Sequence, residues 1–326
     1  MISVAVIIPY YQREKGILRR ALESVLSQRL ADGVMVDVVV VDDGSPVPAQ
    51  SEVEGLVFAP PFHLTLITQT NAGVGAARNS GLKAIHDTTK YIAFLDSDDS
   101  WHEGHLDQAL EALESGRDFY FCDNRREGHY DSHFAGTPAI QPFIKTQDII
   151  PISKDDVIAL VLQDFPCLLP TVVYRRAAAP ELLFETSLRN AGEDTVFFMQ
   201  LLSGVRECCF SAKIMVDCGP VINIYFGNLG WDSAGNLPRI IDRLKSHVMI
   251  KNTIPLSRKH KILNDILIVR LRRNVAFHAL RCLIKSGRWP QEMQVMASED
   301  RWFYAWFMFY GFEVAVGWAL GVYHPA

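Results

Sequence analysis

The segment Tyr91-Ile92-Ala93-Phe94-Leu95-Asp96-Ser97-Asp98-Asp99-Ser100 decides how the rest of the chain is interpreted. An apolar run leads directly into three acidic residues. Short apolar runs are typical of buried strands, and in open α/β sheets the loops at the carboxyl ends of strands carry the ligand site. Because crowded carboxylates repel one another, a cation is expected among them. Oxygen ligands beside a phosphorylated ligand suit Mg2+ or Mn2+. The segment therefore predicts a metal ion that in turn holds a phosphate.

The composition is that of a folded protein with no nucleic-acid signature. The chain has 326 residues, of which 49% are hydrophobic and 21% charged, and its net charge is −5. These values predict one large or two smaller domains with a full core. The six cysteines show no Cys-x-x-Cys spacing, which favours a reducing compartment over a zinc site or a disulfide framework. Since no basic region precedes Val4–Ile8, we expect no signal peptide and a cytoplasmic location.

The first two thirds of the chain alternate between strand and helix patterns. We expect strands at 4–9, 37–41, 64–68, 91–95, 119–122, 170–174 and 212–217, and helices at 17–26, 75–85, 104–113 and 194–202. This alternation predicts a doubly wound, mostly parallel α/β sheet. Polar or aromatic residues follow four of the strands, at Tyr10-Tyr11, Asp42-Asp43, Thr68–Asn71 and Asp96–Asp99. The carboxyl ends of these strands are therefore the expected ligand site.

From residue 236 onward the pattern becomes helical and basic. Lys and Arg far outnumber Asp and Glu between Lys251 and Arg301, and Glu313 is the only acidic or basic residue of 302–323. That aromatic segment is long enough to span a bilayer, although a mid-membrane glutamate costs about 2.5–3.5 kcal/mol. Three interpretations stay open, namely a spanning helix, a helix lying on the membrane surface, and a contact with a second subunit or the catalytic domain. The predicted domains are 1–235 and 236–326.

Several short motifs together resemble the family-two glycosyltransferases with the GT-A fold. They are Val6-Ile7-Ile8-Pro9-Tyr10-Tyr11, Val40-Val41-Asp42-Asp43-Gly44-Ser45, Asn71-Ala72-Gly73 with Ala77-Arg78-Asn79-Ser80-Gly81, Phe94-Leu95-Asp96-Ser97-Asp98-Asp99, and Gly192-Glu193-Asp194. Pro9-Tyr10-Tyr11-Gln12-Arg13-Glu14 is also similar to bacterial exopolysaccharide glucosyltransferases of the succinoglycan type. The resemblance implies a metal-dependent inverting enzyme. Its reaction would move one hexose, with glucose expected, from a UDP-sugar to a saccharide or lipid-linked saccharide.

The resemblance places the nucleotide-sugar site in 1–125 and the acceptor site in 126–235. The implied nucleotide-sugar residues are Pro9, Tyr10, Tyr11, Arg13, Asp43, Asn71, Gly73, Arg78, Asp96, Ser97 and Asp98. An aromatic side chain at Tyr10 or Tyr11 could stack on the base, although a core aromatic is the plainer interpretation. Asp43 would accept from the uracil imide N–H while Asp42 satisfies the turn. Arg78 would neutralise the diphosphate or support the acidic loop.

The implied metal ligands and catalytic residues are acidic. Asp98 would bind Mn2+ or Mg2+ directly, and Asp96 would meet the ribose or the hydration shell of the metal. Asp194 would be the catalytic base, with Glu193 beside it to position the acceptor or tune its pKa. The alternative is that these acids only cap helices, because acidic residues favour helix starts.

The chain departs from the family between Tyr225 and Ser233. This stretch has no His or Arg, so a third protein ligand of the metal is in doubt, and Trp231 is a weak candidate for stacking on a sugar. His247 falls on a predicted helix, where we expect it to be solvated. The Gln-x-x-Arg-Trp pattern of processive synthases is absent, which favours the addition of a single sugar.

Three other functions compete with glycosyl transfer. Gly73-Val74-Gly75-Ala76-Ala77-Arg78 resembles a dinucleotide fingerprint, but Arg78 replaces the third glycine, which argues against a dehydrogenase. A sugar-phosphate nucleotidyltransferase would need a glycine-rich loop where Tyr10 and Tyr11 stand. A non-catalytic nucleotide-sugar-binding protein is disfavoured by the presence of both Asp98 and Asp194.

Overall fold

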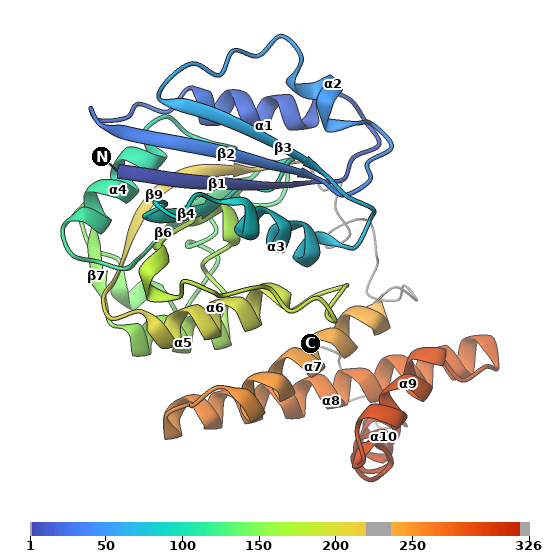
Figure 1. Cartoon of the computed structure of the whole chain (residues 1–326). Helices are drawn as coiled ribbons and strands as arrows, with labels where there is room; N and C mark the ends of the chain where they lie inside the picture. Colours follow the sequence, from blue (N-terminus) through green and yellow to red (C-terminus); the bar gives the residue numbers. More distant parts are fainter. Residues whose placement is uncertain (1, 220–235, 320–326) are drawn as a thin grey trace. The chain divides into compact units, whose positions relative to one another are not determined.

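The computed structural model describes residues 2–219 and 236–319. The chain forms two compact units, one of Met1–Ser187 with Phe197–Ile222 and one of Leu188–Val196 with Asn223–Ala326. The first unit holds the β-sheet and the second is mainly helical (Figure 1). The limits of 1–235 and 236–326 inferred from the sequence stay a prediction.

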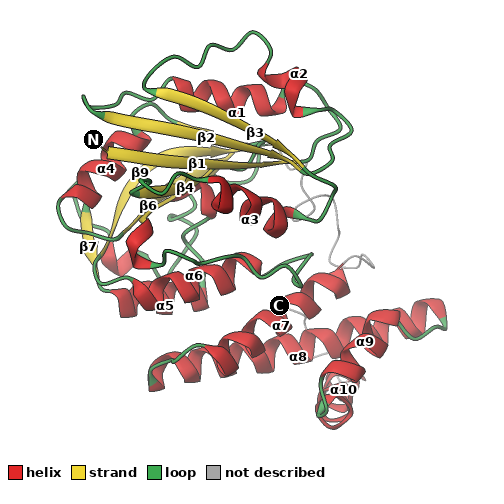
Figure 2. Ribbon diagram, in the orientation of Figure 1, coloured by secondary structure: helices red, strands yellow, loops and turns green. Residues whose placement is uncertain are grey.

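The first unit is built on one mixed sheet (Figure 2). Its strands are β1 (Ile2–Tyr10), β2 (Val34–Asp42), β3 (Phe62–Thr68), β4 (Tyr91–Phe94), β5 (Ser100–Trp101), β6 (Phe119–Arg126), β7 (Ile150–Ile152), β8 (Val172–Arg175) and β9 (Cys208–Cys218). The order is β3-β2-β1-β4-β8-β6-β9-β5, with β7 beside β9. The stretch β3-β2-β1-β4 is entirely parallel, whereas β5, β7 and β8 pair antiparallel to their neighbours. All seven predicted strands are present.

Helices cover both faces of this sheet (Figure 1). They are α1 (Ile17–Leu26), α2 (Ala49–Val53), α3 (Val74–Ala84), α4 (His105–Glu114), α5 (Lys154–Gln163) and α6 (Glu193–Gly204), with 3-10 turns at Gln141–Phe143, Leu169–Thr171 and Arg176–Ala178. The sequence pattern predicts α1, α3, α4 and α6 but not α5 or the short α2. The interval Gly128–Pro151, which is poor in sequence pattern, holds one 3-10 turn and the beginning of β7.

The residues of β1 alternate between two layers of the core. Val4, Val6 and Ile8 belong to the same cluster as Leu18 and Leu22 of α1. On the opposite face, a Cβ on Gly81 of α3 would lie 2.5 Å from Cγ2 of Ile7, so only glycine lets this helix approach the strand so closely. Burial on both faces explains the continuous apolar runs of the parallel strands.

Four of the described helices share a core of their own in the second unit. They are α7 (Asn236–Thr253), α8 (Arg258–Ser286), α9 (Gln291–Glu299) and α10 (Phe303–Ala319). Their core includes Leu244, Val275, Met293 and Phe303. The expectation that His247 is solvated is wrong, because this side chain is only 5% exposed. Its Nδ1 lies 2.7 Å from Oδ1 of Asn264, so the pair joins α7 to α8 inside the unit.

The aromatic segment near the C-terminus forms α10. The carboxylate of Glu313 pairs with the guanidinium of Arg273 in α8, with N–O distances of 2.8 and 3.1 Å. Among the described helices, none combines the length and the apolar character needed to cross a bilayer. The spanning interpretation of residues 302–323 therefore finds no support in the described part of this segment.

Candidate active site

The register of the parallel strands brings the predicted loops to one edge of the sheet. Tyr10 is paired with Asp42, and Asp42 with Thr68, so β1, β2 and β3 end at the same level. β4 lies on the other side of β1, and Phe94 at its end is paired with Ile7. The segments that follow these four strands are therefore neighbours.

The two aspartates after β2 make different contacts. Asp42 accepts from the backbone N–H of Ser45 at 2.7 Å and of Ala49 at 2.8 Å, and so closes the turn and fixes the start of α2. Asp43 accepts from Gln69 Nε2 at 2.7 Å and from the N–H of Ala72 and Gly73 at 2.8 and 2.9 Å. A carboxylate has about four lone-pair sites, so one site on the Asp43 Oδ2 remains for a further donor.

Asn71 and Gly73 fold around Asp43. Asn71 Nδ2 donates to the backbone oxygen of Asp43 at 3.0 Å. Gly73 has φ +95°, a region that favours glycine, and it precedes the first residue of α3. The loop thus turns its backbone N–H groups inward onto the carboxylate.

The aromatic pair after β1 is divided between core and surface. Tyr10 is 1% exposed and belongs to the core, where burial raises the pKa of its hydroxyl, whereas Tyr11 is 44% exposed. Pro9 is buried within β1, and Arg13 is exposed. Of the two tyrosine rings, only that of Tyr11 is therefore accessible to a nucleotide base.

Gln12 links three of the loops, a role that its sequence motif does not predict. Its N–H donates to Ser45 Oγ at 2.9 Å, and its Nε2 donates to Ser97 Oγ at 3.2 Å. Ser45 and Ser97 lie 33 and 85 positions away from Gln12 along the chain, so no local pattern could have indicated the link. Ser97 itself is buried and positioned by this bond.

Arg78 supports the acidic loop from α3. Its Nη2 donates to Asp96 Oδ1 at 2.9 Å, and its guanidinium lies 5.2 Å from the centre of the Phe184 ring. Arg78 is 5% exposed, while the side chain of Asp96 is 29% exposed. Arg78 is thus paired with the acidic loop, while Asp96 still faces solvent in part; the role of Arg78 in the site stays a prediction.

Asp98 and Asp99 are held against the end of β9. Burial raises the pKa of Asp99 well above its usual range, and the negative charges of Asp98 and Asp96 raise it further. Asp99 Oδ1 accepts from the N–H of Gly219 at 2.8 Å, and the guanidinium of Arg20 donates to the backbone oxygen of Asp98. The loop is thus held by hydrogen bonds to α1 and to the residue that follows β9.

The donor set of this loop suits a hard divalent cation. Among residues 2–219 and 236–319 no three His, Cys, Asp or Glu side chains are grouped to hold a metal by themselves. Mg2+ is commonly bound through only one or two carboxylates, with phosphate and water oxygens completing the shell. The negative charges of Asp98 and Asp96 help to raise the pKa of Asp99, and a bound cation would offset this repulsion. Asp98 and Asp96 stay the predicted ligands.

Glu193 and Asp194 stand in the first turn of α6, within the second unit. Asp194 Oδ1 accepts from the N–H of Thr195 at 2.7 Å. The segment before them is anchored to α7, because the backbone N–H and the Nδ2 of Asn190 both donate to Asp242 Oδ2, at 2.9 and 2.7 Å. The catalytic roles of Glu193 and Asp194 stay predictions, and Trp231 lies outside the described residues.

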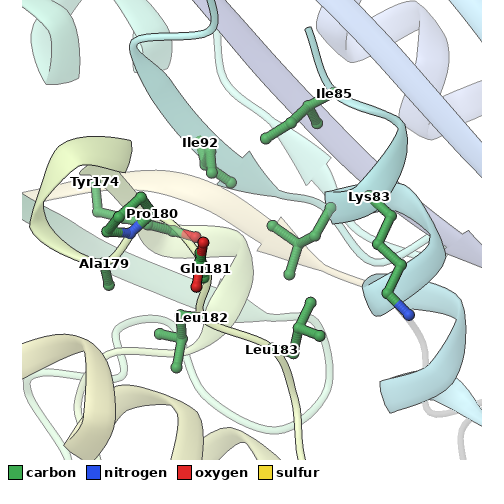
Figure 3. A pocket seen from close by; sticks show the side chains of 10 residues that line it. Lys83, Ile85, Ile92, Tyr174, Ala179, Pro180, Glu181, Leu182 and Leu183 are labelled. Carbon is green, nitrogen blue, oxygen red and sulfur yellow. The ribbon is translucent and has the colours of Figure 1, made fainter. Parts of the chain in front are cut away.

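A cavity of about 210 Å³ in the first unit lies away from these loops (Figure 3). It is lined by Leu82 and Lys83 at the end of α3, by Ile92 near the start of β4, and by Glu181. Because the acidic residues follow the opposite end of β4, we assign this cavity no part in catalysis.

Comparison with known proteins bears on the family and the fold. Residues 5–159 match the model of glycosyl transferase family 2. The succinoglycan biosynthesis protein ExoW of Rhizobium meliloti strain 1021 is 33% identical over 227 residues, which are 67% of each chain. The minor teichoic acid biosynthesis protein GgaA of Bacillus subtilis strain 168 is 29% identical over 208 residues, 61% of this chain and 43% of GgaA.

Solved structures share the architecture at low sequence identity. S. aureus TarS 1-349 aligns with a TM-score of 0.63 at 16% identity, covering 99% of this chain and 93% of that one. Its complex with UDP-GlcNAc aligns with a TM-score of 0.60 at 19% identity, over 86% and 73% of the two chains. These likenesses confirm the predicted fold class, a GT-A α/β fold with a helical C-terminal extension. Together with the family model and the extent of the match to ExoW, they show that this chain is a glycosyltransferase and belongs to glycosyltransferase family 2.

Proposed function

We propose that this enzyme transfers a single hexose, with glucose the first candidate, from a UDP-sugar to a hydroxyl group of a saccharide or lipid-linked saccharide in bacterial polysaccharide synthesis. The observation that carries the proposal is the juxtaposition, at one edge of the sheet, of the Asp43 carboxylate and the Asp96–Asp99 loop. A nucleoside diphosphate needs a hydrogen-bond acceptor for its base and a cation to offset the charge of its phosphates. Asp43 would supply the acceptor, and the acidic loop would hold the cation. ExoW and GgaA act in succinoglycan and teichoic acid biosynthesis, which supports a polysaccharide product.

The donor is proposed to lie across the loops of this edge. The uracil imide N–H donates to the remaining site on Asp43, and the ring of Tyr11 stacks on the base. Asn71 and Gly73 let the backbone approach the nucleotide, and Arg78 holds Asp96 toward the ribose. A bound Mn2+ or Mg2+ ion, held by Asp98, would stabilise the charge of the leaving diphosphate. TarS binds UDP-GlcNAc, and the mannosyltransferase PcManGT of Pyrobaculum calidifontis binds GDP-Man with Mn2+.

The reaction is a single displacement with inversion at the anomeric carbon. The acceptor oxygen forms a bond to that carbon while the bond to the diphosphate oxygen breaks. Asp194 takes the proton of the acceptor hydroxyl, and Glu193 positions the acceptor. No covalent intermediate with the enzyme forms. With the family shown, the nucleotidyltransferase and the non-catalytic binding protein are no longer needed as explanations.

A donor analogue tests the base contact on which the proposal depends. UDP methylated at N3 of uracil cannot donate to Asp43, so calorimetry should show at least tenfold weaker binding than with UDP. Replacing Asp43 by Ala should abolish that preference, because the side chain then has no acceptor for the imide N–H. UDP-glucose, UDP-galactose and UDP-N-acetylglucosamine, each assayed with Mn2+ for UDP release, then identify the sugar. Equal binding of UDP and its N3-methyl form by the unmodified enzyme would contradict the proposal.

A further inference from the structure

The outer face of α10 carries large apolar side chains that face solvent. Seven large hydrophobic residues between positions 302 and 318 are at least 39% exposed. They are Trp302, Tyr304, Met308, Phe309, Phe312, Val316 and Trp318. Met308, Phe309 and Phe312 are 71%, 66% and 73% exposed. Exposed apolar groups at this density mark an interaction surface rather than the scattered residues of an ordinary surface.

The exposed positions cover a broad arc of the helix. At 100° per residue, the exposed residues from Tyr304 to Trp318 spread over about half of the circumference. The other half packs into the core of the second unit through Phe303, Trp306 and Phe307. A helix that packs on one partner needs an apolar stripe of only about 100°, and α10 already satisfies that need on its inner side. The outer arc is therefore wider than one packed helix would need, and it suits a continuous apolar medium.

No acidic side chain lies on this outer arc. Glu313, the only charged residue of α10, pairs with Arg273 at N–O distances of 2.8 and 3.1 Å, which neutralises it against α8. Just before the helix, the exposed Arg301 places its guanidinium 5.2 Å from the centre of the Trp302 ring. An arginine and a tryptophan at the edge of an apolar face are typical of helices at a membrane–water interface.

The net charge of residues 236–319 decides which of two partners fits this face better, a second copy of the chain or a membrane with anionic lipid. Residues 236–319 contain 14 Lys and Arg against 6 Asp and Glu, a net charge of +8, although the whole chain carries −5. A second copy docked on this face would bring two such positive segments together. Anionic lipid instead attracts each nearby cation. We therefore propose that the outer face of α10 lies in the interfacial layer of a membrane that contains anionic lipid, with Arg301 among the headgroups. This goes beyond the proposed function, since it does not depend on the identity of the sugar.

Vesicle binding by the full chain tests the proposal. Vesicles of phosphatidylcholine with phosphatidylglycerol should float the protein, and pure phosphatidylcholine should bind it at least tenfold less. Exchanging Met308 and Phe312 together for Glu should lower binding to the anionic vesicles at least tenfold. The matched control exchanges Ile262 and Ile266 of α8 for Glu, since these are also four residues apart, in the same unit, and 53% and 59% exposed. The control should bind like the unmodified chain.

Two results would overturn the proposal. The first is that the unmodified protein does not bind the anionic vesicles, or that both double variants bind them equally. The second is that light scattering finds a dimer which Met308→Glu with Phe312→Glu converts to monomers, since the face would then belong to a second copy. Circular dichroism melts of both variants establish that any difference does not come from misfolding.

Discussion

Asp194 and Glu193 are adjacent but predicted to differ in function. Exchanging Asp194 for Asn keeps an oxygen that can accept from the N–H of Thr195, so the start of α6 should remain folded. Loss of the base should lower turnover by about 10²- to 10⁴-fold, the usual contribution of general base catalysis. Binding of UDP should be unchanged in calorimetry. Glu193→Gln, the control, should lose much less turnover, and an active Asp194→Asn enzyme would mean that another group takes the proton.

Gly219 is predicted to position the acidic loop. An added Cβ would lie 2.0 Å from the backbone oxygen of Asp98, so Gly219→Ala must displace either the loop or the end of β9. Since displacing a reacting group by about 1 Å can cost about 100-fold in rate, we expect kcat/KM to fall about 10- to 100-fold. The readout that separates positioning from stability is the Mn2+ concentration needed for half-maximal activity, which should rise. Gly136→Ala is the control, because its Cβ would meet nothing closer than 3.6 Å.

Single residues show where sequence reasoning succeeds and fails. Asp42 forms the turn hydrogen bonds that the sequence predicts, because its partners Ser45 and Ala49 lie only three and seven positions further along the chain. Tyr10 lies in the core although it immediately precedes a surface residue, because it is the last residue of β1, which is buried on both faces, whereas Tyr11 already belongs to the loop. Gly219 escaped notice because its partner Asp99 is 120 positions away, and only the fold brings them together.

At the scale of elements, α7 is predicted to fix the first turn of α6. Asp242 is 7% exposed and accepts two hydrogen bonds from Asn190, so Asp242→Ala removes a buried acceptor and both of these bonds. Bonds to charged groups contribute about 1.5–3 kcal/mol, and we expect a loss of that size in urea unfolding. The control is Asp265→Ala, which breaks an exposed ion pair with Lys251 that should contribute about 0–1 kcal/mol. Equal losses in the two variants would show that this anchor is unimportant.

The elements with strong periodicity were predicted, and the weakly patterned ones were not. The apolar runs of β1, β2 and β4 and the amphipathic α1 identify themselves locally. α5 went unrecognised because it follows a stretch that is poor in pattern, although Ser153 caps it by accepting from the N–H of Asp156. The two-residue β5 exists only because β9 pairs with it, which no local signal can show.

At the scale of the whole molecule, buried histidines predict a loss of stability in mild acid. Burial lowers the pKa of His105 to about 3 and those of His247 and His278 to about 4. In the unfolded chain each titrates near its ordinary value of about 6.5. Between these values the unfolded state binds more protons, so the free energy of unfolding decreases as the pH falls. The stabilisation is complete above about pH 6.5.

Calorimetry between pH 8 and pH 5 should therefore show a melting temperature that is level above pH 7 and falls below it. Each histidine changes the free energy of unfolding by at most about 1.4 kcal/mol per pH unit. His247 and His278 belong to the helical unit and His105 to the sheet unit, so the transition of the helical unit should shift more. The exchange His247→Gln removes one titrating group while keeping a side chain that can bond to Asn264, and it should reduce that shift by about half. A melting temperature that does not change between pH 7 and pH 5 would show that the histidines are already accessible to protons in the folded protein.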